Sequence, residues 1–237
     1  MMDIHSHIIY GLDDGAKTIE DSELMINMAY NDGIRSMIAT PHYNKYYIYD
    51  IESMEKRFQE IVDKFKEDKS DLKFYLGNEA YLDEYLLEAL VGGKCKTLGG
   101  SQYVLIELSY NSPLQMVKKM LFDIIISGYI PIIAHCERLI GTKDDLNKII
   151  ELKEMGCYMQ INVSILNKSK IWLKRWLLKR LKDHTISFVS SDAHNISNRR
   201  PILMDAYNMV SKKIGREIAD NVFLSNPEKI VLGGTII

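Results

Sequence analysis

The feature that most constrains the fold is a regular alternation of short apolar segments with longer amphipathic ones. The apolar segments predict β-strands, and they lie at residues 2–7, 34–39, 73–76, 103–106, 130–134, 157–163 and 186–189. The amphipathic segments predict helices at residues 18–31, 50–69, 113–127, 143–155, 169–181, 201–212 and 214–223. Strands that alternate with helices are parallel, and their continuous apolar character is typical of strands covered on both faces.

Two α/β architectures fit this alternation: an open doubly wound sheet and a barrel of strands and helices. We favour the barrel because polar, chemistry-bearing residues follow nearly every predicted strand, and barrel enzymes place their active sites at the carboxyl ends of the strands. No Pro-, Gly- or Ser-rich linker divides the 237 residues. The sequence therefore predicts one domain over residues 1–237.

Two histidine-containing pairs mark the ends of the first and last predicted strands. His5 and His7 are separated by one residue, and Asp192 and His194 repeat that spacing. Side chains two apart on a strand point to the same face. Because imidazole is the commonest side-chain metal ligand, each pair is half of a coordination sphere.

The other strand ends supply further nitrogen and oxygen donors, although a lone carboxylate at such a place usually caps the following helix. Nine candidate ligands at one face of a barrel are better explained as a metal site. They are His5, His7, Asp14, His42, Glu79, Glu107, His135, Asp192 and His194, which leaves only His184 as a surface or helix-end histidine.

Nine ligands exceed what one ion uses, and a carboxylate such as Glu79 can bridge two ions. Imidazole together with carboxylate favours Mn, Fe or Zn over an all-oxygen magnesium cage. We therefore predict two or three ions, with Mn, Fe and Zn as the candidates and Mg as an alternative; the family resemblance described below puts Mn²⁺ first. A water held between two such ions is deprotonated near neutral pH and can attack phosphorus.

Composition excludes several other classes. The formal net charge of −2 offers no global positive field for nucleic acid. Three cysteines without CxxC spacing suit a reducing compartment, and neither a signal peptide nor a transmembrane segment is visible, so we expect a cytoplasmic protein. A cysteine-dependent phosphatase needs Cys-x5-Arg, but the residues six after the cysteines are Ser101, Thr142 and Val163.

Five motifs in order resemble the PHP (polymerase and histidinol phosphatase) superfamily over residues 2–201. Within it they most resemble the bacterial manganese-dependent protein-tyrosine phosphatases of capsule and exopolysaccharide loci. The motifs are Met2-Asp3-Ile4-His5-Ser6-His7, Gly11-Leu12-Asp13-Asp14-Gly15-Ala16, Thr40-Pro41-His42, Ile132-Ile133-Ala134-His135-Cys136-Glu137-Arg138 and Ser190-Ser191-Asp192-Ala193-His194-Asn195.

The resemblance implies a distorted seven-stranded (β/α) barrel with three metal ions. By analogy, the ions take His5, His7, Glu79 and Asp192; Glu79, Glu107 and His135; and Asp14, His42 and His194. It also implies phosphate-binding arginines at Arg138 and Arg199, with Arg200 as a neighbouring alternative to the second. One departure is Cys136, where the family usually has Pro; we expect a local backbone difference there and no ligand or nucleophile role.

The implied function is hydrolysis of phosphotyrosine on a protein, most simply a bacterial tyrosine kinase that regulates polysaccharide synthesis. Metal-assisted phosphoester hydrolysis follows from the residues, whereas the protein substrate follows from the resemblance alone. Alternatives are a small-molecule phosphomonoesterase such as histidinol phosphatase, a PHP-type nuclease, or a metal-binding module without catalysis. The sequence also allows a homo-oligomer.

Two further segments have a functional and a structural interpretation. Tyr43, Tyr46, Tyr47 and Tyr49 follow His42 and form either an aromatic rim for the substrate ring or an ordinary packed loop. Residues 168–182 carry seven basic residues and both tryptophans, and we interpret them as an outer barrel helix rather than a membrane-docking surface.

Overall fold

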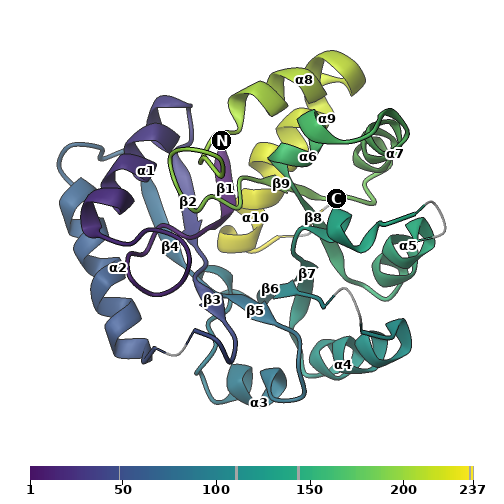
Figure 1. Cartoon of the computed structure of the whole chain (residues 1–237), viewed down its shortest axis with the longest axis horizontal. Coiled ribbons are helices and arrows are strands. Elements are labelled where there is room, and N and C mark those ends of the chain that lie inside the picture. Colours follow the sequence, from purple (N-terminus) through teal and green to yellow (C-terminus); the bar gives the residue numbers. More distant parts are fainter. Residues whose placement is uncertain (48, 110–111, 143–144, 235, 237) are drawn as a thin grey trace.

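A curled sheet of parallel strands forms the centre of the protein, with helices around it (Figure 1). The computed structural model describes residues 1–47, 49–109, 112–142, 145–234 and 236. Every pairing between named strands is parallel. The strands are β1 (Met2–Ser6), β2 (Ser36–Ala39), β3 (His42–Tyr43), β4 (Lys73–Leu76), β5 (Glu79–Tyr81), β6 (Tyr103–Glu107), β7 (Ile130–Ile133), β8 (Tyr158–Asn162) and β9 (Phe188–Ser190).

Two of the strand positions are interrupted near their carboxyl ends. β2 pairs with β4 and β3 pairs with β5, and the offset along the chain is the same in both pairs: Ser36 lies opposite Lys73, and His42 lies opposite Glu79. β3 therefore continues the path of β2, and β5 continues that of β4. The hydrogen bonds divide the described strands into two sheets, in the orders β1-β2-β4 and β3-β5-β6-β7-β8-β9. With each interrupted strand counted once, these strands occupy seven positions around one curled layer, as expected for the seven-stranded barrel.

The first and last strands meet at their carboxyl ends. The backbone N–H of His7 donates to the carbonyl of Ala193 (2.8 Å), and the N–H of Asp192 donates to the carbonyl of His5 (3.0 Å). These hydrogen bonds bring the two histidine-containing pairs side by side, although 185 residues separate His7 from Asp192 in the sequence. The predicted α/β barrel is confirmed as a curled, half-barrel-like parallel sheet.

Helices lie along the outside of the sheet, except that α10 packs against its inner core. α1 begins after the predicted capping pair: the Thr18 hydroxyl accepts from the Asp21 N–H, and the Asp21 carboxylate accepts from the Thr18 N–H. The helices are α1 (Ile19–Asn31), α2 (Ile51–Phe65), α3 (Leu86–Val91), α4 (Leu114–Ile126), α5 (Leu146–Glu154), α6 (Val163–Lys168), α7 (Ile171–Lys182), α8 (Met204–Ile214), α9 (Arg216–Asp220) and α10 (Asn226–Leu232).

Some expected elements differ from those observed. β3, β5, α3 and α6 were not predicted, because elements of two to six residues are too short to carry a hydrophobic period. The helix predicted at 214–223 is confirmed from Arg216 onward, but its predicted end is wrong: α9 passes through a π-helical segment, Asn221–Ser225, into α10, which was not predicted. The predicted start of a helix at residue 143 lies outside the described residues, and α5 begins at Leu146.

Two apolar clusters cover the two faces of the curled sheet, one on the inside and one on the outside. The inner cluster takes alternate residues of single strands, such as Met2 and Ile4 of β1, together with Ile230 of α10. The outer cluster lies between the strands and the surrounding helices. The barrel interior is therefore filled by apolar side chains, and the polar residues gather at the carboxyl ends of the strands. Among the described helices, none combines the length and apolar character needed to cross a bilayer.

Candidate metal centre

All nine predicted ligands lie at the carboxyl end of the sheet, on seven different segments of the chain. His5 lies in β1 and His7 follows it, Asp14 lies in the loop before α1, and Asp192 and His194 follow β9. Four come from the strands between: His42 in β3, Glu79 in β5, Glu107 at the end of β6 and His135 after β7. The interruptions of two strands place His42 and Glu79 at this end.

Glu79 occupies the middle of the cluster and is almost fully buried. Its Oε2 atom lies 3.1 Å from His5 Nε2, 3.2 Å from His7 Nε2 and 3.1 Å from His42 Nδ1. Its other oxygen, Oε1, lies 2.6 Å from His135 Nε2. One carboxylate thus faces four imidazoles, two from β1 and the residues after it, one from β3 and one that follows β7, which is the arrangement of a bridging ligand.

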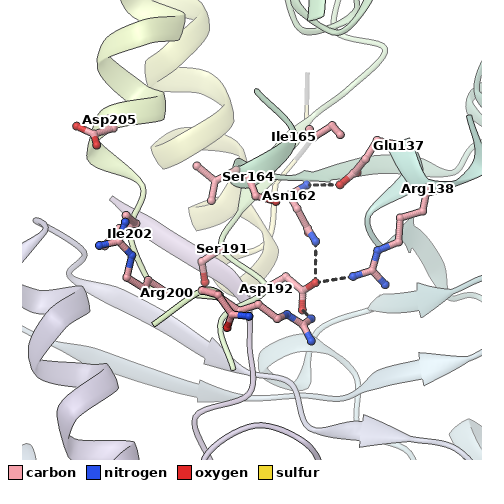
Figure 2. A pocket seen from close by; sticks show the side chains of 13 residues that line it. Glu137, Arg138, Asn162, Ser164, Ile165, Ser191, Asp192, Arg200, Ile202 and Asp205 are labelled. Atoms are coloured by element: carbon pink, nitrogen blue, oxygen red, sulfur yellow. Dashed lines mark hydrogen bonds and ion pairs between the residues drawn. The ribbon is translucent and has the colours of Figure 1, made fainter. Parts of the chain in front are cut away.

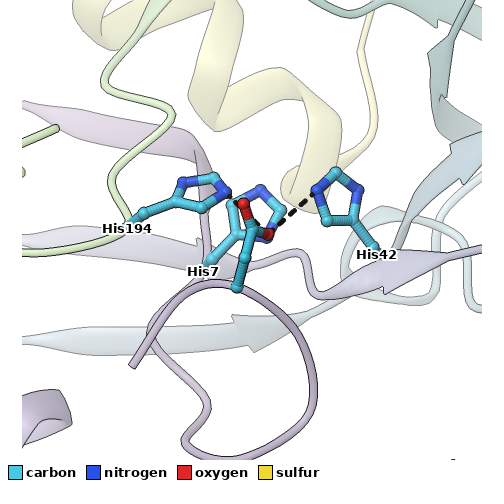
Figure 3. Close-up of side chains that lie close together, drawn as sticks. His7, His42 and His194 are labelled. Atoms are coloured by element: carbon cyan, nitrogen blue, oxygen red, sulfur yellow. Dashed lines mark ion pairs between the residues drawn. The ribbon is translucent and has the colours of Figure 1, made fainter. Parts of the chain in front are cut away.

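A second carboxylate joins the remaining histidines at the rim. Asp14 Oδ1 lies 3.4 Å from His42 Nε2 and 3.3 Å from His194 Nε2. Figure 3 shows the three histidines His7, His42 and His194 close together at this place. The His7 and His194 rings lie 3.8 Å apart between centroids, so His7 faces this group as well as Glu79. Asp14 is about half exposed, and this part of the cluster opens to solvent.

The three ligand sets implied by the resemblance compare closely with the observed clustering. His5, His7, Glu79 and Asp192 form one group with donor atoms within 4.8 Å of one another, and the set of Asp14, His42 and His194 recurs with His7 added. For the middle set, the geometric group is His42, Glu79 and Glu107, while His135 Nε2 lies 2.6 Å from Glu79 and 3.5 Å from Glu107.

Hydrogen bonds to Nδ1 orient the imidazole rings of His5, His7 and His194. Nδ1 of His5 lies 3.2 Å from Gln160 Oε1, Nδ1 of His7 lies 2.7 Å from Asp13 Oδ2, and Nδ1 of His194 lies 3.0 Å from the Asp192 carbonyl. An oxygen acceptor at Nδ1 holds the proton there and leaves the Nε2 lone pair free. In all three residues that lone pair faces the centre of the cluster, as metal-binding histidines require.

The donor set therefore fits divalent metal ions, judged from the contacts themselves. Among the described residues, Glu79 Oε2, His42 Nδ1 and His194 Nε2 are buried and have no hydrogen-bond partner of acceptable geometry. Such atoms are costly to bury unless something binds them. The donors are all nitrogen and oxygen, which suits Mn, Fe or Zn.

Asp13 supports the cluster and was not singled out from the sequence. Besides His7 Nδ1, its carboxylate accepts the N–H groups of His42 (2.9 Å) and Gly15 (2.8 Å). Burial alone would lower the pKa of His7, but the Asp13 carboxylate raises it to about 10 in the metal-free protein. Burial alone would raise the pKa of Asp13, yet the His7 imidazolium and these N–H donors lower it to about 2.

β8 contributes no candidate ligand but supplies two amides that hold ligands from three other strands. Gln160 Oε1 accepts the His135 backbone N–H (2.7 Å) as well as facing His5, and Gln160 Nε2 donates to Asn162 Oδ1 (3.0 Å). Asn162 Nδ2 then donates to Asp192 Oδ2 (2.6 Å). The signal for these residues was present in the sequence as polar side chains inside an otherwise apolar strand.

Two ligand positions have left-handed backbone conformations that only a few non-glycine residues adopt. His135 has φ 31° and Asp192 has φ 52°. Such conformations persist where surrounding contacts fix them, and they cluster at functional sites. The contacts here are the Gln160 side chain at the His135 N–H and the His5 carbonyl at the Asp192 N–H.

Both predicted arginines reach the cluster and contact the same carboxylate from two sides. Arg138 Nη2 donates to Asp192 Oδ2 (3.0 Å), and Arg199 Nη2 donates to Asp192 Oδ1 (2.7 Å). Burial would raise the pKa of Asp192, but the neighbouring histidines and Arg199 keep it below its ordinary value. Arg200 forms no ion pair with any residue that the structure describes, so the contact geometry favours Arg199 over Arg200.

Cys136 lies next to the ligand His135 but is fully buried in the outer core. Burial raises the pKa of its thiol, which agrees with the expectation that it is neither a ligand nor a nucleophile.

Two of the tyrosines that follow His42 contact it. Tyr47 stacks on His42, with ring centroids 5.4 Å apart and planes inclined by 6°, and the Tyr49 hydroxyl donates to the His42 carbonyl (2.8 Å). These tyrosines brace a ligand, while Tyr46 is exposed.

Comparison with known proteins agrees with this geometry. A family model described as "Capsular polysaccharide synthesis, CpsB/CapC" matches residues 1–232. The tyrosine-protein phosphatase CpsB of Streptococcus pneumoniae is 34% identical over 239 residues, which cover 98% of each chain. The tyrosine-protein phosphatase YwqE of Bacillus subtilis is 31% identical over 100% of this chain and 93% of its own.

Solved structures give the same result. A crystal structure described under "YwqE from Bacillus subtilis and CpsB from Streptococcus pneumoniae, unique metal-dependent tyrosine phosphatases" matches with a TM-score of 0.91 and 29% identity, covering 100% of this chain and 96% of the other. A putative histidinol phosphatase from Listeria monocytogenes matches with a TM-score of 0.53 and 12% identity, which is a likeness of fold. The chain belongs to the CpsB/CapC family of capsular polysaccharide synthesis proteins.

Proposed function

We propose that this protein is a metal-dependent protein-tyrosine phosphatase that releases inorganic phosphate from phosphotyrosine. The observation that carries the proposal is the Glu79-centred cluster of nine nitrogen and oxygen donors with Arg138 and Arg199 at its edge. The relatives named tyrosine-protein phosphatase support the substrate class.

Two or three divalent ions, Mn²⁺ first, would be held by the nine donors. His5, His7, Glu79 and Asp192 would hold one; Glu79, Glu107 and His135 a second; and Asp14, His42 and His194 a third. When bound, such ions supply a deprotonated water as nucleophile and neutralise charge on the phosphate. Asp13 and Gln160 would keep the His7 and His5 lone pairs aimed at the ions.

Arg138 and Arg199 would bind the non-bridging phosphate oxygens. A guanidinium offers N–H donors in a planar fork that matches phosphate oxygens. Each arginine here directs one Nη atom to Asp192, and the other Nη atom lies 3.6 Å from a second carboxylate, Glu107 for Arg138 and Asp14 for Arg199. Asp192 thereby holds the two guanidinium groups at the edge of the cluster. As negative charge develops on the phosphoryl oxygens, these fixed donors stabilise the transition state.

The reaction is a hydrolysis in which water is the only co-reactant. An oxygen from water forms a bond to phosphorus, the bond between phosphorus and the phenolic oxygen breaks, and the electron pair leaves with that oxygen, which takes up a proton. Phenol has a pKa of roughly 10, so its oxygen leaves with less proton assistance than an alkoxide. No dedicated general acid is required.

We further propose that the substrate tyrosine belongs to a bacterial tyrosine kinase that regulates polysaccharide synthesis, and that the reaction takes place in the cytoplasm. The family's link to capsular polysaccharide synthesis supports this context. The three cysteines, all free and buried, suit a reducing compartment.

A comparison of substrates on one metal-loaded preparation tests the proposal. Manganese-loaded protein should release phosphate from a phosphotyrosine peptide with a kcat/KM at least tenfold above that for histidinol phosphate, and chelation followed by dialysis should abolish both activities. Failure to release phosphate from the peptide refutes the proposal. A preference for histidinol phosphate instead favours a small-molecule phosphomonoesterase.

A further inference from the structure

A cavity of about 540 Å³ lies directly beside the metal cluster (Figure 2). Arg138, Asp192 and Arg199 line one part of it, and Val163, Ile165 and Ile202 supply apolar side chains to its walls. Figure 2 shows Arg138 and Ile202 on opposite sides of the view, with Asp192 between them. The volume is within the roughly 300–1,000 Å³ of small-ligand sites.

We propose that this cavity binds the phenyl ring of the substrate phosphotyrosine and thereby selects aryl over alkyl phosphates. The phosphate would lie at the end formed by Arg138 and Arg199, and the ring would lie against the apolar wall. The proposal rests on the proposed phosphatase function and adds the residues that recognise the leaving group.

Charge and polarity in this cavity match the two ends of a phosphotyrosine side chain. Both arginines that contact Asp192 line it, so a phosphate dianion is favoured at that end. Val163 and Ile165 from α6 and Ile202 from the loop after β9 provide apolar surface for an aromatic ring, between polar lining residues that include Arg200 and Asp205. Burial of a ring there is favourable because its apolar surface is removed from water.

The neighbouring cavities lack this combination. One of about 590 Å³ lies at Tyr43 and Asp50, and one of about 210 Å³ lies at Asp14 and Lys17; neither has an arginine among its described lining residues. A phosphate placed in either would not meet the guanidinium pair.

The direction of the reaction also favours this cavity for the leaving group. In an in-line displacement the attacking and leaving oxygens lie on opposite sides of phosphorus. The attacking water comes from the donor cluster, where Asp192 Oδ1 lies 3.4 Å from His5 Nε2. Asp192 also lines the cavity, so a phosphate held between the cluster and the two arginines would have the cavity on the side of its leaving oxygen.

A phosphoserine side chain would leave the apolar wall unfilled. Its phosphate joins a single methylene rather than a ring, so the peptide backbone would have to enter the cavity to bring that phosphate to the arginines. The backbone would then take the place of the ring against the apolar side chains, and placing polar backbone groups against apolar surface is unfavourable. We therefore expect the cavity to distinguish phosphotyrosine from phosphoserine by the leaving group and not by the phosphate.

Truncation of the wall tests this assignment. Ile202→Ala and Ile165→Ala are compared with the parent in the manganese-loaded full chain, and Ile171→Ala, at an exposed isoleucine on α7, is the matched control. Three quantities are measured: kcat/KM for a phosphotyrosine peptide, kcat/KM for a phosphoserine peptide with the same flanking residues, and the inhibition constant of inorganic phosphate.

We expect each wall variant to lower kcat/KM for the phosphotyrosine peptide about tenfold, with unchanged values for phosphoserine and inorganic phosphate. Ile171→Ala should match the parent. Equal losses on both peptides, or no loss on phosphotyrosine, would overturn the ring-binding role. If the parent releases phosphate from neither peptide, the phosphatase function itself fails, which is a distinct result.

Discussion

Glu79 and His135 lie in contact, with Glu79 Oε1 2.6 Å from His135 Nε2, while the other carboxylate oxygen of Glu79 faces three further imidazoles. One buried carboxylate thus joins two groups of donors. The donors therefore form one cluster around Glu79 rather than separate sites.

Glu79→Gln should therefore remove metal from more than one position. The amide is neutral and offers one acceptor oxygen, so it cannot bridge two cations as a carboxylate can. We expect at least two-thirds of the bound manganese and at least 99% of the phosphatase activity to be lost, with an unchanged far-ultraviolet circular dichroism spectrum. Metal content is measured by plasma mass spectrometry, and Glu84→Gln, at an exposed glutamate, is the control. Retention of the full metal content would contradict the bridging role.

Gln160→Met should weaken metal binding although Gln160 is not a ligand. The substitution keeps the side-chain length but removes the acceptor for the His135 N–H and for His5 Nδ1. Loss of such supporting hydrogen bonds typically costs about 10- to 100-fold in metal affinity. Competition with a fluorescent chelator measures that affinity. Gln59→Met, at an exposed glutamine on α2, should bind metal like the parent, and equal affinity of the two variants would argue against the role of Gln160.

Arg138→Lys and Arg199→Lys should each lower kcat/KM for phosphotyrosine about 100-fold, with metal content unchanged. Lysine keeps the charge but not the planar fork that pairs with phosphate oxygens. Arg216→Lys provides a control at an arginine that is exposed on α9. Because both arginines are also held by Asp192, a variant that lost metal as well would indicate a structural role instead.

The buried thiols should be inert to alkylation. Burial raises the pKa of Cys95 and of Cys157 to about 12, and it raises that of Cys136 as well, so the reactive thiolate is scarce at pH 8. Native protein treated with iodoacetamide at pH 8 should keep its phosphatase activity, and intact-mass measurement should show no added carbamidomethyl group. Inactivation that parallels modification of one cysteine would be inconsistent with a metal-dependent mechanism.

Stability of the metal-free protein should depend on pH through His7. Its pKa in the folded protein is about 10, above the ordinary 6.5, because the Asp13 carboxylate outweighs the effect of burial. The stabilising contribution is therefore fully present below pH 6.5 and is lost as pH rises through 10. Melting temperatures of the chelated parent and of Asp13→Asn should differ at pH 6.5 and converge toward pH 10. A difference that stayed constant would exclude this coupling.

The sequence predicted the elements with strong local signals. Residues 73–76 form β4 as expected, and Thr18 and Asp21 cap α1 in the predicted way. All nine candidate ligands lie in one cluster because each ends a parallel strand or follows one closely, and parallel strands share one carboxyl edge. Chain direction placed all nine at one edge, and the closure expected of a barrel brings the first and last strands together there.

Other features depended on contacts between distant segments and could not be predicted. Gln160 is visible in the sequence as a polar residue within an apolar strand, but its role depends on His5, 155 residues away. Asp13 likewise accepts the N–H of His42, 29 residues away, which no local spacing indicates. The hydrogen bonds between β1 and β9, and the cavity walled by α6 and Ile202, likewise form only when the sheet curls.

The most direct test of the central claim is a crystal structure of manganese- and phosphate-soaked protein with anomalous scattering recorded at the manganese edge. We predict two or three anomalous peaks among the nine donors, at least two of them within coordination distance of Glu79, and a phosphate within hydrogen-bond distance of both Arg138 and Arg199. A single peak, or peaks outside the Glu79 cluster, would contradict a multinuclear phosphatase centre.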